Sequence, residues 1–166
     1  MCCDVVHPPI VKTVLWPNER ATEAFAARLA PLAALHNAFI AIDGELGAGK
    51  TALVRHLLRA LGVTGRIKSP TYAVVEPYSL PQLAVWHFDS YRFSDPREWE
   101  DAGFRDIFAS PGLKLAEWPD KVAGYLPRPD LSLQLTVADD ESRQVRLSAH
   151  GATGLALLAV ALEACA

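Results

Sequence analysis

Residues 44–51 have the residue types and the spacing of a loop that binds phosphate groups. They match the pattern Gly-x-x-x-x-Gly-Lys-Thr, and the eight positions are Gly44, Glu45, Leu46, Gly47, Ala48, Gly49, Lys50 and Thr51. Glycines let the backbone turn tightly and direct its N–H groups at phosphate oxygens, and a following helix adds the positive end of its dipole. The Lys50 amine can reach the terminal phosphates, and the Thr51 hydroxyl can bind Mg²⁺. This P-loop therefore predicts binding of a nucleoside triphosphate with Mg²⁺.

A strand and a helix are expected on the two sides of this loop. Residues 38–42 are all apolar, as in a buried strand, and residues 52–61 carry apolar side chains at helical spacing. The alternative is a plain glycine-rich turn between a strand and a helix. It is disfavoured because roughly one per cent of chains of this length, or fewer, match the pattern by chance.

Two carboxylates follow other predicted strands. Asp89 comes directly after residues 83–88, and Glu117 comes after residues 113–116. A P-loop site needs one carboxylate for Mg²⁺ and a group that orients the attacking water. Spacing alone does not decide which of the two binds the metal, and each could instead cap a turn or form a surface ion pair. Ligands of α/β sheets bind at the carboxyl ends of the strands, so we expect both side chains to lie near the P-loop.

The remaining pattern predicts a three-layer α/β fold. The expected strands cover residues 11–16, 38–42, 71–77, 83–88, 113–116, 131–137 and 145–149. The expected helices cover residues 19–30 after the cap Asn18, residues 52–61, and a short segment that follows Ser94-Asp95-Pro96 and ends by Gly103. The last two strands should form an antiparallel hairpin near a sheet edge. The mixed order of strands and helices favours a mainly parallel central sheet.

The composition is typical of one globular domain. The chain has 166 residues, of which 51% are hydrophobic and 21% are charged. We therefore expect a single domain over residues 1–166, with residues 1–10 and 151–166 as loosely ordered ends or, for the apolar tail, a docked helix. The tail is too short to span a bilayer, and the N-terminus lacks the pattern of a signal peptide.

The three cysteines fit a reducing compartment. Cys2, Cys3 and Cys165 lie at the ends of the chain, and neither their number nor their spacing suggests a disulfide framework or a metal site. A cytoplasmic location, without a membrane partner, fits these features best.

Charge gives little support for direct binding to nucleic acid. The formal net charge is −3 at pH 7. Residues 46–75 nevertheless contain no acidic residue. The basic residues in this stretch are Lys50, Arg55, Arg59, Arg66 and Lys68. They indicate either a phosphate site followed by a solvated helix face, or a docking surface for an acidic partner or RNA.

Four motifs together resemble one bacterial family. In chain order they are the P-loop, Ser69-Pro70-Thr71-Tyr72, His87-Phe88-Asp89-Ser90-Tyr91-Arg92 and Glu117-Trp118-Pro119. Their order and intervals resemble the TsaE family, also called YjeE, over nearly the whole chain. The resemblance implies a P-loop ATPase that uses ATP and Mg²⁺ in the synthesis of threonylcarbamoyladenosine in tRNA. It also implies that the chain acts on the TsaD–TsaB pair, contacts tRNA only indirectly and does not transfer the threonylcarbamoyl group.

The resemblance also implies roles for single residues. Lys50 and the loop backbone would hold the phosphates, Thr51 and Glu117 would bind Mg²⁺, and Asp89 would serve hydrolysis. Residues 69–72 and 87–92 would be switch-like segments that respond to the γ-phosphate, with Thr71 closing onto the nucleotide. Trp118 would line the nucleotide site, although a core tryptophan is the alternative.

Some positions beside the motifs carry other predictions. His87 is expected to be a packed or hydrogen-bonding histidine and not a general base, because phosphoryl transfer depends mainly on positioning and electrostatics. For Arg92 a surface ion pair is favoured over a contact with phosphate or a partner. Asp43 and the pair Ser142-Arg143 depart from the family pattern, which has an apolar or aromatic residue and a Gly-Arg turn there. The residues that recognise adenine stay unassigned.

Two other functions remain as alternatives. One is a small P-loop metabolite kinase, but residues 96–103 offer only Arg97 for the arginine-rich lid of such enzymes. The other is a nucleotide-dependent binding switch without significant catalysis. Specificity for guanine is disfavoured, since the sequence Asn-Lys-x-Asp does not occur in the chain.

Overall fold

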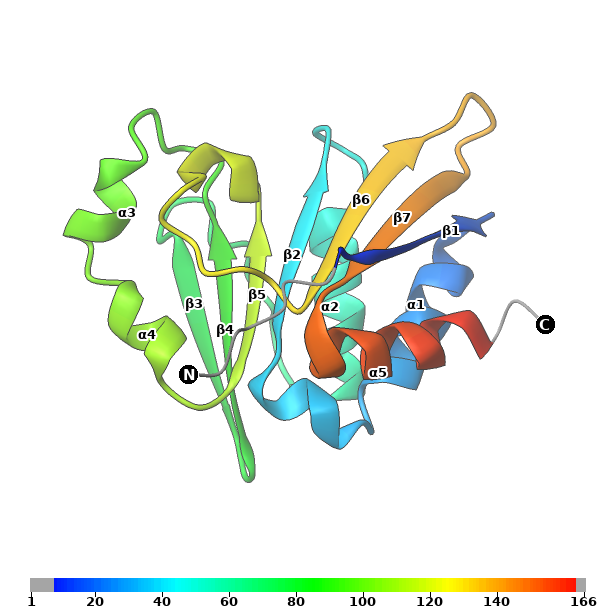
Figure 1. Ribbon diagram of the computed structural model, residues 1–166, viewed down its shortest axis with the longest axis horizontal. Helices are drawn as coiled ribbons and strands as arrows, with labels where there is room; N and C mark the ends of the chain where they lie inside the picture. Colours follow the sequence, from blue (N-terminus) through cyan, green and yellow to red (C-terminus); the bar gives the residue numbers. More distant parts are fainter. Residues whose placement is uncertain (1–7, 164–166) are drawn as a thin grey trace.

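One seven-stranded sheet with helices on both faces organises residues 8–163, the part of the chain that the computed structural model describes (Figure 1). The strands are β1 (Ile10–Trp16), β2 (Phe39–Gly44), β3 (Val75–Leu80), β4 (Leu83–Asp89), β5 (Leu113–Glu117), β6 (Leu131–Val137) and β7 (Arg143–Ala149). The helices are α1 (Glu19–Leu29), η1 (Ala33–Asn37), α2 (Lys50–Ala60), α3 (Arg97–Asp101), α4 (Arg105–Ala109), η2 (Pro119–Val122) and α5 (Gly151–Leu162). The predictions for Cys2, Cys3 and Cys165 lie outside the described residues.

The strands follow the order β1-β7-β6-β2-β5-β4-β3. The four central strands β6, β2, β5 and β4 are parallel to one another, and their carboxyl ends point to the same upper edge in Figure 1. The other three pairs, β1–β7, β6–β7 and β3–β4, are antiparallel. The expectation of a mainly parallel sheet therefore holds only for its centre, because two hairpins and an N-terminal edge strand complete a mixed sheet.

Two features of the sheet differ from the sequence prediction, namely the edge position of β1 and the start of β3. The hairpin β6–β7 forms as expected, but β1 pairs with β7 and becomes the edge of the sheet. The strand expected over residues 71–77 begins only at Val75, so its predicted start was wrong. A turn replaces its first residues, closed by a hydrogen bond of 2.6 Å from the Val74 N–H to the Pro70 carbonyl. This turn leaves Thr71 outside the sheet and free to approach the P-loop.

One face of the sheet packs against α1, α2 and α5 in a single apolar core. Asn18 caps α1 as predicted, because its side-chain oxygen accepts a hydrogen bond of 3.3 Å from the Ala21 N–H. Phe25 and Leu29, one helical turn apart, are each only 1% exposed and direct α1 into this core. The apolar tail is a docked helix, since Leu157 and Leu158 of α5 are also buried there. Within residues 8–163, no helix has both the length and the hydropathy to cross a bilayer.

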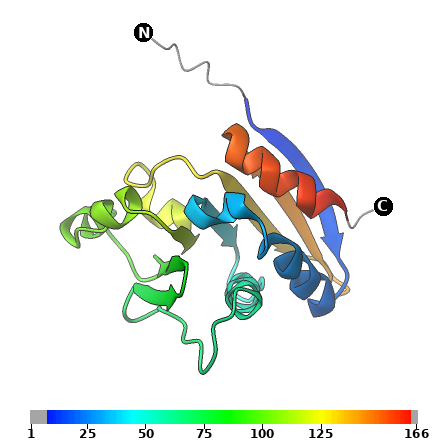
Figure 2. The ribbon, with the colours of Figure 1, turned by 90° about the horizontal axis from the view of Figure 1, so that it is seen from below.

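The opposite face carries a smaller aromatic core over β2, β4 and β5. Phe88 of β4 is fully buried at its centre, with the rings of Trp99, Phe104 and Phe108 at centroid distances of 5.0, 5.4 and 5.1 Å. These rings belong to the α3–α4 segment, which Figure 2 shows set apart from α1, α2 and α5. The α3–α4 segment thus forms the third layer of the fold. It covers only the part of the sheet that contains β2, β4 and β5.

Candidate functional site

The P-loop connects β2 to α2 in the way its sequence requires. Gly44, the last residue of β2, lies so close to β6 that a Cβ atom there would be 2.7 Å from the Leu135 carbonyl oxygen. Gly49 caps the N-terminus of α2 with a φ of 102°, a left-handed conformation that only glycine adopts readily. The glycines therefore allow the tight turn that directs the first N–H groups of α2 toward the space above the loop.

Lys50 folds back over the loop that precedes it. Its Nζ donates hydrogen bonds to the carbonyl oxygens of Gly44 and Glu45, at 2.5 and 2.8 Å, and lies 4.0 Å from the ring centroid of Trp118. Burial lowers the pKa of the Lys50 amine, and the charges of Glu117, Asp43 and Asp89 oppose this shift. The amine is thus held over the loop by contacts with neutral carbonyl groups, which an anion can replace.

A cavity of about 320 Å³ lies above the loop. It is lined by Leu46, Gly47, Gly49, Lys50, Thr51, Ala52, Ser69, Thr71, Asp89, Tyr91, Glu117 and Trp118. Of the positions expected at the site, Gly44, Glu45 and Ala48 do not line it. Ala48 is 1% exposed in the main core, and its carbonyl accepts a hydrogen bond of 3.2 Å from Nε of Arg143.

Thr51 and Glu117 meet at the floor of this cavity. The Thr51 hydroxyl donates a hydrogen bond of 2.9 Å to Oε1 of Glu117, whose residue is only 1% exposed. The second oxygen, Oε2, lies 2.5 Å from Nε2 of His87. The pairing of β4 with β5 sets Asp89 directly beside Glu117. The expectation that both carboxylates lie close to the P-loop is therefore met.

Asp89 is held by both of the segments that the sequence singled out as switch-like. Its Oδ1 accepts a hydrogen bond of 2.9 Å from the Tyr91 N–H, and its Oδ2 accepts one of 3.5 Å from the Thr71 hydroxyl. Thr71 in turn lies 2.8 Å from the Ser69 hydroxyl. Burial raises the pKa of the Asp89 carboxyl, the Tyr91 hydrogen bond opposes the shift, and the charge of Glu117 adds to it.

The positions of Trp118 and Arg92 decide between the alternatives that the sequence left open for each of them. Trp118 is half-buried, lines the cavity and packs against the Tyr91 ring at a centroid distance of 5.0 Å, so it is not a core residue. Arg92 stacks on the exposed ring of Tyr72, 3.9 Å from its centroid. Among the described residues it forms no ion pair, so the favoured surface ion pair is absent there.

Three contacts of the site were not foreseen. The Tyr91 backbone binds Asp89, Arg143 binds the loop at Ala48, and His87 binds Glu117. The prediction that His87 is a hydrogen-bonding histidine is confirmed, but the sequence contained no signal for its partner. The sequence did show that His87 lies near the site, because its i,i+2 spacing to Asp89 places both side chains on one face of β4.

The donor set at the floor of the cavity suits Mg²⁺. A hydroxyl and a carboxylate offer the hard oxygen ligands that this ion prefers, and Mg²⁺ usually combines one or two such ligands with water and substrate phosphates. Within the described part of the chain no cluster of three or more His, Cys, Asp or Glu side chains could hold a metal.

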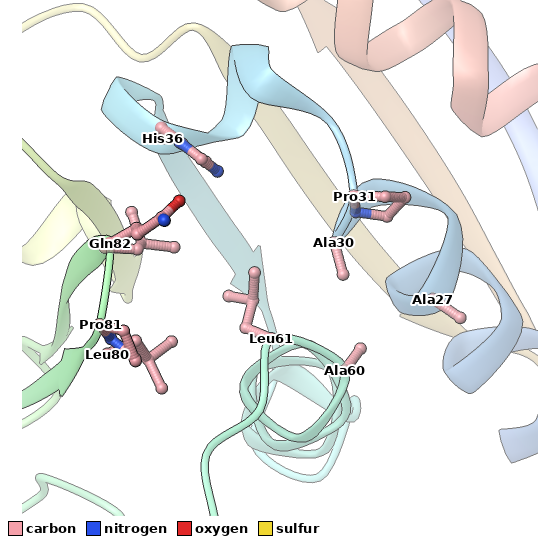
Figure 3. Close-up of a pocket in the computed structure, with 10 residues that line it drawn as sticks. Ala27, Ala30, Pro31, His36, Ala60, Leu61, Leu80, Pro81 and Gln82 are labelled. Carbon is pink, nitrogen blue, oxygen red and sulfur yellow. The ribbon is translucent and has the colours of Figure 1, made fainter.

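A larger cavity, of about 660 Å³, lies at the opposite edge of the sheet (Figure 3). Its walls come from the carboxyl ends of α1 and α2, from η1 and from the β3–β4 turn, and they include Pro31, Leu61, Pro81 and Leu83. It contains neither a carboxylate nor a lysine or arginine among its lining residues. The smaller cavity is therefore the candidate functional site, because it alone of the two combines a lysine with carboxylates.

The geometry agrees with the comparison to a protein family. The family model described as "Threonylcarbamoyl adenosine biosynthesis protein TsaE" matches residues 16–145. A tRNA threonylcarbamoyladenosine biosynthesis protein TsaE from Haemophilus influenzae is 42% identical over 109 residues, which are 66% of this chain and 68% of the relative. A protein of the same name from Bacillus subtilis is 31% identical over 142 residues, covering 85% and 89%.

A solved structure has the same arrangement of elements. The crystal structure of YdiB from Bacillus subtilis superposes with a TM-score of 0.78 at 25% sequence identity. The superposition covers 96% of this chain and 99% of that one. The mixed α/β sheet is therefore shared with this protein over nearly its whole length.

Proposed function

This chain belongs to the family of threonylcarbamoyl adenosine biosynthesis proteins TsaE, and from this we propose that it binds ATP with Mg²⁺ and hydrolyses it slowly as an accessory protein in tRNA modification. It acts on a complex of TsaD and TsaB and does not itself transfer the threonylcarbamoyl group to adenosine. The observation that supports this best is one cavity in which the P-loop amine, the Thr51 hydroxyl and two buried carboxylates converge.

The loop and the start of α2 provide the phosphate cradle. The N–H groups of the first helical turn have no partners within the helix and point toward the cavity. Lys50 adds the positive charge, and its present contacts to two carbonyl oxygens can be exchanged for phosphate oxygens without moving the backbone. A charge-assisted hydrogen bond to phosphate is stronger than these neutral ones.

Thr51 and Glu117 hold the metal end of the site. Bound Mg²⁺ would neutralise negative charge on the phosphate oxygens. The Thr51 hydroxyl and Oε1 of Glu117 are 2.9 Å apart, so these two oxygens would hold the same ion. Glu117 is 1% exposed, and the surrounding residues therefore fix its position before any ligand enters.

Asp89 orients the water that attacks the terminal phosphate. Its carboxylate lines the cavity beside Thr71, and its two oxygens accept from a backbone N–H and a hydroxyl. The Thr71 contact, at 3.5 Å, is the longer and weaker of the two. When Thr71 turns to the nucleotide, Oδ2 of Asp89 becomes free to accept a hydrogen bond from water.

The same contacts provide a link to the partner proteins. Thr71 and Tyr91 belong to different surface segments, and both are bound to Asp89. Outside the site, Arg92 stacks on Tyr72 and joins these segments again. A change at the phosphate is thus passed to the exposed surface, where TsaD and TsaB bind. The net charge of −3 favours protein partners over direct contact with tRNA, and the role implies a cytoplasmic location.

The test is the steady-state ATPase rate of the purified chain with Mg²⁺, alone and with TsaD, TsaB and tRNA. Slow hydrolysis that changes when the partners are added supports the proposal. Bound ATP without hydrolysis under either condition would instead identify a nucleotide-dependent switch. Rapid hydrolysis that ignores the partners would point to a kinase-like enzyme with a small acceptor. The Asp89→Asn variant measures the background from contaminating ATPases.

A further inference from the structure

His87 occupies an unusual position for a titratable side chain. It lies in β4, two residues before Asp89, and its side chain is 0% exposed. Its Nε2 is 2.5 Å from Oε2 of Glu117, whose side chain is 2% exposed. This contact links two neighbouring strands below the cavity, and none of the roles assigned above to the P-loop site uses it.

The hydrogen bonds around the ring identify the donor. Nδ1 of His87 is buried and has no hydrogen-bond partner among the described residues. A neutral imidazole carries one N–H donor and one lone pair. The network therefore assigns the proton to Nε2, which donates it to Glu117.

Glu117 is consequently held from two sides. His87 binds Oε2, and the Thr51 hydroxyl binds Oε1. A carboxylate that has a single hydrogen bond can rotate about its last side-chain torsion, which is a soft one. With both oxygens bound, Oε1 stays directed at Thr51 and at the end of the cavity where the metal is expected.

We propose that His87 is a positioning residue that fixes the rotation of the Glu117 carboxylate and thereby sets the affinity of the site for Mg²⁺. This inference rests on the proposed function, because it assumes that Glu117 and Thr51 hold the ion. The physical reason is general: partners that hydrogen-bond to a metal-binding carboxylate orient it, and their loss typically weakens metal affinity about 10- to 100-fold.

A direct catalytic role for His87 does not fit the same geometry. Nε2 is engaged by Glu117, and the fully buried ring has no path to the water that attacks the phosphate. His87 therefore acts through Glu117.

The experiment measures binding of Mn²⁺, as a paramagnetic probe for the Mg²⁺ site, to the full chain loaded with a non-hydrolysable ATP analogue. The variants are His87→Leu, which removes the donor, and His87→Gln, whose amide nitrogen reaches about the place of Nε2. His56→Leu is the matched control, since His56 of α2 forms the other His–Glu pair of the described structure, with Glu19 of α1 at 2.9 Å and away from the cavity. Affinity for the analogue without metal is measured in parallel.

The expected result separates metal affinity from nucleotide affinity. His87→Leu lowers the Mn²⁺ affinity about 10- to 100-fold, His87→Gln stays within about threefold of the unmodified chain, and the control is unchanged. Affinity for the metal-free analogue stays within about threefold in every variant. If His87→Leu does not fold, as judged by thermal unfolding, His87→Asn replaces it, because its shorter amide cannot reach Glu117.

Two outcomes overturn the inference, and they are distinguishable from failure of the proposed function. Equal Mn²⁺ affinity in the unmodified chain and in His87→Leu would show that Glu117 needs no support. Equal losses in His87→Leu and His87→Gln would show that the ring matters by its shape and not by its hydrogen bond. An unmodified chain that binds no analogue or no Mn²⁺ would refute the proposed function itself, together with this inference.

Discussion

The Thr51 hydroxyl donates a hydrogen bond of 2.9 Å to the carboxylate of Glu117, although 66 positions separate the two residues in the sequence. The parallel pairing of β2 with β5 explains their proximity, because it sets Glu117 opposite Ile42, two residues before the P-loop. The bond ties the first turn of α2 to the end of β5. Any ligand that binds Thr51 is therefore also close to Glu117.

Lys50→Ala should weaken ATP binding about 10- to 100-fold. Among the described residues that line the cavity, Lys50 is the one with a positive charge. A hydrogen bond to a charged group contributes roughly 1.5–3 kcal/mol, which corresponds to this change in affinity. Isothermal titration calorimetry with ATP measures it, and Lys68→Ala, an exposed lysine outside the cavity, serves as control. Equal affinities in the two variants would contradict the assignment of the loop.

Thr51→Ala should raise the Mg²⁺ concentration needed for half-maximal ATPase activity by about tenfold, the low end of the losses seen when metal-site partners are removed. Binding of metal-free ATP should change much less, because the backbone N–H groups of α2 remain in place. Thr51→Ser keeps a hydroxyl at the same position and should restore the Mg²⁺ dependence. A serine variant as impaired as the alanine variant would show that the threonine methyl group, and not the hydroxyl, is what the site requires.

Asp89→Asn should retain ATP and lose turnover. The amide keeps the size of the side chain and can still accept one of its two hydrogen bonds, but without its charge it accepts a weaker hydrogen bond from the attacking water and orients it less well. Groups in this role typically contribute about 10²–10⁴-fold to the rate. Single-turnover hydrolysis and equilibrium binding of ATP separate the two effects. Loss of nucleotide binding in this variant would make Asp89 a binding residue or a structural one.

Gly154→Ala should destabilise the fold, although alanine is the better helix former. A Cβ atom at this position of α5 would lie 1.9 Å from the Asp130 carbonyl oxygen, so the helix would have to move away from the sheet. Overpacking of this kind costs about 1–3 kcal/mol, which urea unfolding detects. The exposed Ala156 of the same helix is the control, since Ala156→Gly should also destabilise, by about 1 kcal/mol from helix propensity alone. A Gly154→Ala variant of increased stability would mean that α5 does not pack as described.

Asp43→Asn should stabilise the protein at neutral pH. The pKa of the Asp120 carboxyl is raised by burial and further by the charge of Asp43. A carboxyl whose pKa is higher in the folded state contributes stability below its unfolded pKa of about 4 and loses it as the pH rises through the folded value.

Removal of the Asp43 charge should therefore increase the free energy of unfolding at pH 7, but by less than about 1 kcal/mol, because Asp120 is exposed and solvent screens the repulsion. The gain should vanish near pH 3, where the Asp120 carboxyl is protonated and carries no charge. Urea unfolding at the two pH values measures this difference, and Asp139→Asn, at an exposed turn, is the control. A gain of the same size at both pH values would exclude electrostatic repulsion as its cause.

The sequence predicted the residues of the site better than it predicted the contacts that hold them in place. The P-loop, Asp89 and Glu117 were recognisable because glycine spacing and the ends of apolar strands are local patterns, and parallel pairing then brings them together. The link from His87 to Glu117 depends on the neighbouring strand. The residues around His87 do not indicate how β4 pairs with β5, so the contact between His87 and Glu117 could not be predicted from the sequence.

The mistaken start of β3 has a different cause. Val74 adopts a φ of 68°, which β-branched residues rarely do, and residues 71–77 read as a strand because their side chains favour one. The α4 helix was missed because its five residues are too few to show a helical period. At Val74, tertiary contacts beside the site overrule the local preference, since the Val74 carbonyl accepts a hydrogen bond of 2.8 Å from the Asp89 N–H.

The pairing of β1 with β7 has a consequence for biosynthesis on the ribosome. Ile10 lies opposite Ala149, so the first strand to be translated pairs with the last. Until residues 143–149 have emerged from the exit tunnel, β1 has backbone groups and apolar side chains without their final partner. Such an exposed strand is a target for chaperones and for aggregation. The sheet is thus completed only after its last strand has been translated.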